Sequence, residues 1–139
     1  MIISLRRPLP DGAGYVSQWF GQNPEFYAPF GLAGHEGIDY AVPVGTPVMA
    51  AQDGLVVAGE SAAYGLYVRV VNAWFATVYG HLSEVRITPG QDVKAGDVIG
   101  LSGNTGRSTG PHLHLGLRVI GMRNQAYANY IDPAPFRDV

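Results

Sequence analysis

Histidine is the residue type in this sequence best suited to metal binding and proton transfer, and the chain has only four: His35, His81, His112 and His114. Each lies beside a glycine or flanks an expected strand rather than deep in an apolar run. His112 and His114 are two positions apart, and the alternation of side chains along a strand places both on one face. Such a pair can serve one metal site.

His35 and Asp39 form a second candidate pair, four positions apart. Gly37 and Pro43 argue against a helix here and favour an extended segment, in which the even spacing places both side chains on one face. Catalytic zinc sites use three protein ligands drawn from His and carboxylate groups and leave a fourth position for water. His35, Asp39 and one histidine of the 112/114 pair satisfy this count.

The two histidines left over are then available to move protons. His81 ends the expected strand that starts near residue 75, and strand alternation places Tyr79 on the same face as His81. Tyr79 is therefore predicted to line the site and to contact the substrate.

Short β-branched runs separated by turn signals are the elements that must position these residues. The chain contains 19 glycines and 10 prolines, which leave little room for an uninterrupted helix. The expected strands span residues 46–51, 55–59, 66–71, 75–82, 98–101 and 113–120. We expect an all-β fold, with a compact, mostly antiparallel sheet, a barrel- or sandwich-like core and long surface loops that form a groove.

A chain of 139 residues is expected to form one domain. We divide it into an N-terminal loop region (1–34), a catalytic β core (35–120) and a closing tail (121–139). The loop region is rich in Gly, Pro and aromatic side chains, and its rings are expected to support one wall of the groove. The rings concerned are those of Trp19, Phe20, Phe26 and Tyr27.

Charge and composition exclude several classes of function. The net charge is -2 and no block of Lys or Arg follows the chain, so nucleic acid and anionic membranes are not expected partners. There is no cysteine, which removes disulfides, cysteine metal sites and cysteine nucleophiles. The segment 100–108 superficially resembles a phosphate loop, but the glycine spacing is wrong and Arg107 stands in place of the lysine. No secretion signal or membrane span is readable.

Taken together, four short stretches resemble the M23 zinc metallopeptidases of the lysostaphin and LytM type. These stretches are His35–Ala41, Gly45–Val48, Tyr79–Ser83 and Ser108–His114. The resemblance covers about residues 17 to 120. It implies a mostly antiparallel β core with a long groove, zinc bound by the first His, the Asp and the last His, and catalysis by the other two. In this sequence the implied ligands are His35, Asp39 and His114, and the implied catalytic residues are His81 and His112.

The function implied by this resemblance is zinc-dependent hydrolysis of peptide bonds in bacterial peptidoglycan, in the stem peptide or the cross-bridge. The alternative is a catalytically silent relative that only binds the wall. One departure from the family pattern is Gly116, which stands where members usually carry a Glu that could support the metal site. We expect a monomer that acts on wall peptides at the bacterial cell wall, with a phage lysis protein (endolysin) or virion component as a possible source.

Overall fold

The computed structural model describes residues 2–137, in which strands predominate and the helices are single turns. The strands are β1 (Tyr15–Gln18), β2 (Ile38–Ala41), β3 (Pro47–Met49), β4 (Gly54–Ser61), β5 (Gly65–Val71), β6 (Phe75–Val85), β7 (Asp92–Val93), β8 (Val98–Ser102) and β9 (His112–Val119). The helical turns are α1 (Pro24–Tyr27), η1 (Ala28–Phe30), η2 (Gln125–Tyr127) and η3 (Ala134–Phe136). None of these helices has the length and apolar character needed to cross a membrane.

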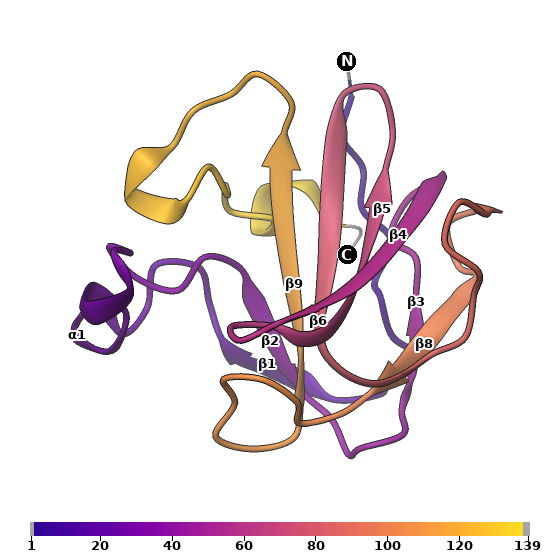
Figure 1. Cartoon of the computed structure of the whole chain (residues 1–139), viewed down its shortest axis with the longest axis horizontal. Helices are drawn as coiled ribbons and strands as arrows, with labels where there is room; N and C mark the ends of the chain where they lie inside the picture. The colour runs from indigo at the N-terminus through magenta and orange to yellow at the C-terminus, as the bar shows by residue number, and fades with distance from the viewer. Residues whose placement is uncertain (1, 138–139) are drawn as a thin grey trace.

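The described strands form one sheet in the order β1-β2-β9-β6-β5-β4-β7, and β8 pairs with β3 and with the far part of β6. Every pairing between these strands is antiparallel, as Figure 1 shows for the central β9, β6, β5 and β4. This confirms the predicted all-β, mostly antiparallel fold. The barrel part of the prediction is not met: β1 and β7 end the path without pairing to each other, so the sheet stays open.

The six predicted strands all occur, as β3, β4, β5, β6, β8 and β9. They were readable because runs of Val, Leu and Ile between Gly and Pro turns favour extended backbone. Strands β1, β2 and β7 were not predicted. They are short, with 4 residues in β1 and in β2 and 2 in β7, and β1 lies in a stretch whose glycines and prolines show no alternation.

Strand β6 bends where it changes partners. Its first part pairs with β5 and β9, and its last part pairs with β8 from Leu82 onward. At the change, His81 has a φ of 62°, a left-handed conformation that is uncommon outside glycine. Such backbone is held only where surrounding structure stabilises it, and here it redirects the His81 side chain.

Alternate residues of β9 divide between two environments. Leu113, Leu115 and Leu117 point into the apolar core and are fully buried. The even-numbered residues of β9, which include His112 and His114, face the other side of the sheet. The two ends of the described chain close on the core as well, through a bridge between Leu5 and Arg137.

Candidate metal centre

Strands β2 and β9 bring the first metal-binding candidates together. In their antiparallel register Asp39 lies opposite His114, and Ala41 lies opposite His112. Directly opposed residues of an antiparallel pair have their Cβ atoms roughly 4.5–5.5 Å apart. The strand register alone therefore places a carboxylate against an imidazole on the outer face of the sheet.

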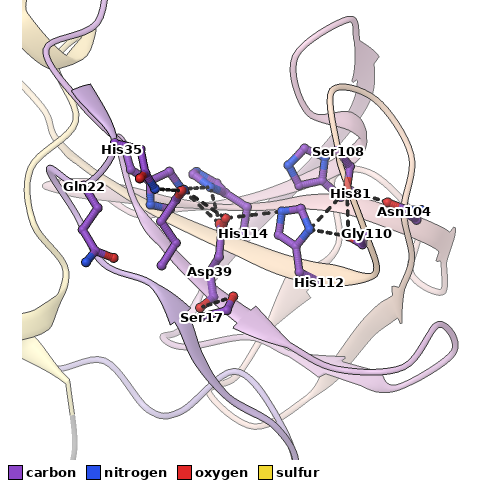
Figure 2. A network of polar contacts seen from close by, with 12 residues as sticks. Ser17, Gln22, His35, Asp39, His81, Asn104, Ser108, Gly110, His112 and His114 are labelled. Atoms are coloured by element: carbon purple, nitrogen blue, oxygen red, sulfur yellow. Dashed lines mark hydrogen bonds and ion pairs between the residues drawn. The ribbon is translucent and has the colours of Figure 1, made fainter. Parts of the chain in front are cut away.

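Three side-chain atoms converge at this point: Nε2 of His35, Oδ1 of Asp39 and Nδ1 of His114 (Figure 2). The carboxylate oxygen lies 3.0 Å from each of the two nitrogens, which are 3.1 Å from each other. Tetrahedral zinc with bonds of roughly 2.0–2.1 Å places its ligand atoms about 3.3 Å apart. The triangle therefore needs only a small expansion to hold such an ion.

His35 reaches this triangle from a bend, not from the extended segment that its spacing to Asp39 predicted. Strand β2 begins only at Ile38, and the backbone of His35 instead forms hydrogen bonds with Gly21 and Gln22. Nδ1 of His35 lies 3.2 Å from the carbonyl oxygen of Trp19. Donation of the Nδ1 hydrogen to that carbonyl leaves the Nε2 lone pair directed at the triangle.

Gly37 allows the bend to pass directly over His114. A Cβ at position 37 would lie 2.7–2.8 Å from the His114 ring and would also collide with the carbonyl oxygen of Leu115. Any side chain at this position would therefore displace one imidazole of the triangle.

A second carboxylate, Glu36, lies at the other nitrogen of the His114 ring. Its Oε1 is 3.7 Å from Nε2 of His114, and one potential ligand atom from each of His35, Glu36 and His114 falls within 4.8 Å of the others. Asp39 is the better ligand candidate, because one of its oxygens lies 3.0 Å from both histidines. Nε2 of His114 is buried without a hydrogen-bond partner, so Glu36 is well placed to orient this ring.

The electrostatics of the triangle suit a cation. Burial by itself raises the pKa of Asp39, but its contacts with His114 and His35 outweigh burial and hold that pKa below its usual range. Burial lowers the pKa of His114, while its hydrogen bond to Asp39 and the carboxylate charge raise it, and the net shift is upward. The site thus keeps its carboxylate ionised and attracts positive charge.

His81 and His112 lie beside the triangle, with their ring centroids 4.5 Å apart. Nδ1 of His81 lies 2.7 Å from the carbonyl oxygen of Thr105, and Nδ1 of His112 lies 2.7 Å from that of Gly110. Donation to these carbonyls leaves Nε2 of each ring free to accept a proton. Nε2 of His112 is 3.5 Å from Oδ2 of Asp39, and burial lowers the pKa of His81 to about 4.

The structure does not bring Tyr79 into this group. Its ring is fully buried in the core, and its hydroxyl accepts hydrogen bonds of 2.7 Å from the Ala51 amide and the Thr77 hydroxyl. Strand alternation predicted that Tyr79 and His81 share a face. The left-handed backbone at His81 breaks that alternation, so His81 reaches the groove while Tyr79 stays inside.

A cavity of about 510 Å³ extends from the triangle and forms the predicted groove. Phe26 and Tyr27 line it, in agreement with the expected aromatic wall, and Tyr27 also lies against His35 with ring centroids 5.5 Å apart. Trp19 and Phe20 are not part of the lining. Phe20 instead packs on Tyr127 at 4.4 Å, which joins the N-terminal region to the segment after β9.

Several groove residues carried no readable sequence signal. Tyr64 lies against His114 with ring centroids 5.2 Å apart, and the Arg107 guanidinium lies 3.7 Å from the Phe30 ring centre. Thr105 contacts His81 through its carbonyl oxygen, which any residue type offers. These contacts depend on loops that meet only in the folded chain.

Comparison with known proteins identifies the family of this chain. Residues 33–133 match the family Peptidase family M23, and this range contains both the triangle and the two neighbouring histidines. The chain belongs to peptidase family M23. Among solved structures, this M23 chain is similar to the catalytic domain of the antimicrobial peptidase lysostaphin from Staphylococcus simulans, with a TM-score of 0.76 and 33% identity over 88% of this chain and 91% of that one.

Two proteins of Vibrio cholerae are also similar to the M23 chain. A zinc containing peptidase has a TM-score of 0.76 and 33% identity over 94% of this chain and 39% of that one. Peptidoglycan DD-endopeptidase ShyA is 49% identical over 92 residues, which make up 65% of this chain and 21% of that protein. The M23 chain thus spans about a fifth of the length of this relative.

The donor set of the M23 chain fits a zinc cofactor. It offers two imidazole nitrogens and one carboxylate oxygen, the ligand types of catalytic zinc sites. In each imidazole the ring nitrogen that points away from the triangle lies near an oxygen atom that can orient the ring. This atom is the Trp19 carbonyl oxygen for Nδ1 of His35 and a Glu36 carboxylate oxygen for Nε2 of His114. This chain therefore carries donor groups suited to zinc, together with groups placed to orient the two imidazoles.

Proposed function

We propose that this chain is a zinc-dependent endopeptidase that hydrolyses peptide bonds in bacterial peptidoglycan. The observation that carries the proposal is the convergence of His35, Asp39 and His114 within 3.0–3.1 Å, next to two histidines whose Nδ1 atoms lie 2.7 Å from backbone carbonyl oxygens. Membership of a peptidase family and similarity to a peptidoglycan DD-endopeptidase support the choice of substrate. On this proposal residues 1–139 form one catalytic unit that acts at the cell wall.

The proposed metal ligands are Nε2 of His35, Oδ1 of Asp39 and Nδ1 of His114. Bound there, zinc supplies Lewis-acid polarisation of a peptide carbonyl and makes water acidic enough to lose a proton near pH 7. The chain holds its ligands in advance, because β2 and β9 set Asp39 against His114 and the Trp19 carbonyl orients His35.

His81 and His112 are the proposed proton carriers. With Nδ1 held by the carbonyls of Thr105 and Gly110, each ring presents Nε2 to the groove as an acceptor. One of them takes the proton of the attacking water, and a proton is delivered to the nitrogen of the leaving amine, so that water adds across the peptide bond. A hydrogen carried on Nε2 of the other would stabilise negative charge on the former carbonyl oxygen.

The direct test is digestion of purified bacterial walls of several cross-link types by the zinc-loaded protein, followed by identification of the new termini. New amino and carboxyl termini within wall peptides, lost on chelation and restored by zinc, are expected. Wall binding without new termini in any wall type would instead support a catalytically silent wall-binding protein.

A further inference from the structure

A second hollow of about 580 Å³ lies at the far end of β9 and carries arginines in place of carboxylates. Arg69 of β5, Arg118 of β9 and Arg123 of the following segment line it. Aliphatic side chains of β5 and β6 lie between them, namely Val71, Ala76 and Val78. The hollow is therefore an apolar surface bordered by guanidinium groups.

Strand register places this hollow on the same side of the sheet as the metal centre. Arg69 pairs with Val78, which pairs with Gly116, and Arg118 pairs with Ala76. Positions 112, 114, 116 and 118 of β9 share one face, so Arg118 follows His114 along that face. Four residues of strand span about 13 Å. In Figure 1 this is the end of the sheet where the β5–β6 turn and the arrowhead of β9 lie.

The three guanidinium groups have no anionic partner within residues 2–137. None of them takes part in an ion pair or a side-chain hydrogen bond there, and the lining contains no Asp or Glu. Nε of Arg69 is buried without a hydrogen-bond partner. Arg69 lies over Tyr67 at 5.3 Å and Arg118 over Tyr130 at 5.4 Å, contacts that support the side chains without neutralising their charge. Positive charge gathered in this way is complementary to an anion.

We propose that this hollow binds a carboxylate-bearing peptide of the wall polymer, at a position outside the bond that is cut. The proposal rests on the proposed function for the nature of the polymer. Guanidinium groups match a carboxylate through paired hydrogen bonds, and the aliphatic surface between them suits the carbon atoms that carry such a group. Tyr64 and Tyr130, with ring centroids 6.4 Å apart, separate the hollow from the catalytic groove.

The test compares the zinc-loaded wild type with a double variant, Arg118→Met and Arg123→Met. Its matched control is Arg86→Met, at an exposed arginine elsewhere on the chain whose side chain pairs with Glu84. We expect the double variant to sediment with purified walls at least about tenfold more weakly and to lose kcat/KM on walls by a similar factor. Hydrolysis of a soluble peptide too short to span about 13 Å should be unchanged, and Arg118→Lys should fall between the two.

The anion is identified by changing the walls. Conversion of wall carboxylates to amides should reduce binding of the wild type to the level of the double variant. Removal of phosphate-bearing polymers from the walls should leave the difference between the proteins intact; if it abolished the difference, the ligand would be a phosphate and the proposal would be wrong. Equal binding of wild type and double variant to untreated walls would also overturn it. Sedimentation decides this even for a protein that cuts nothing, so a failure of the proposed hydrolysis is seen separately.

Discussion

The two hollows on the outer face of the sheet are built on the same strand but differ in what stands opposite it. Over residues 112–115, β9 pairs with β2, which supplies Asp39 to His114. Beyond Leu115 no residue of β2 lies opposite β9. Leu117 of β9 forms a bridge instead with Ile131, which belongs to the segment that follows β9. The lining of the second hollow contains no carboxylate, and Arg118 has no ion-pair partner among the described residues. The comparison shows that the same face of β9 forms a candidate metal centre or a cationic surface, depending on which segment pairs with the strand.

The largest effect on metal binding, which only the first hollow is expected to show, should come from removal of the Asp39 carboxylate. Asp39→Ala should weaken zinc binding by more than about 100-fold, the upper end for loss of a group that merely supports a ligand, and wall hydrolysis should fall with it. Zinc titration and wall assays on the same preparations check this. Asp92→Ala, an exposed carboxylate of β7, is the matched control and should behave as wild type. Retention of zinc by Asp39→Ala would mean that the triangle is not the metal site.

Loss of His81 or of His112 is expected to slow hydrolysis without loss of the bound metal. His81→Ala and His112→Ala should each lower the rate by a factor of about 10² to 10⁴, while one zinc per chain stays bound, because neither ring belongs to the triangle. Zinc stoichiometry, thermal stability and wall cleavage are measured together. Full activity of either zinc-loaded variant would remove that histidine from the mechanism.

A smaller effect is expected from Glu36, the carboxylate on the far side of His114. Glu36→Ala should reduce zinc affinity by about 10- to 100-fold, since the buried Nε2 of His114 loses the carboxylate oxygen that lies 3.7 Å from it. Glu36→Gln retains a carbonyl acceptor and should recover part of that affinity. Competition with a zinc chelator gives the affinities. A loss as large as that of Asp39→Ala would show instead that Glu36 is itself a ligand.

The smallest effect concerns the boundary between the two hollows at Gly116. A Cβ at this position would lie 2.7 Å from Val78 and 3.0 Å from Tyr130, so Gly116→Ala should destabilise the fold by about 1–3 kcal/mol through overpacking. Denaturant unfolding measures this, with Gly110→Ala as control, because a Cβ there meets nothing within 4 Å. Stability equal to wild type would mean that Tyr130 moves aside freely. The Glu expected at position 116 from the family pattern has no room while Tyr130 covers it.

The sequence predicted a group of candidate metal-binding residues, because their chemistry is rare in this chain, and it predicted β6 and β9, the strands that carry His81, His112 and His114. With four histidines and no cysteine, few combinations could hold a metal, and the structure brings His35, Asp39 and His114 to one point. The strands were predictable because alternation and turn residues act locally. The His112 and His114 pair faces one side of β9 for the same local reason.

Only the tertiary structure decided which groups meet across the chain. Alternation predicted that Tyr79 lines the groove, but the bend of β6 at His81 reversed the faces, since β6 exchanges β9 for β8 as its partner there. The approach of Glu36 to His114, the Thr105 carbonyl that holds His81, and the gathering of three arginines each depend on segments far apart in sequence. Such contacts follow from strand partners and loop packing, which no local pattern of residues encodes.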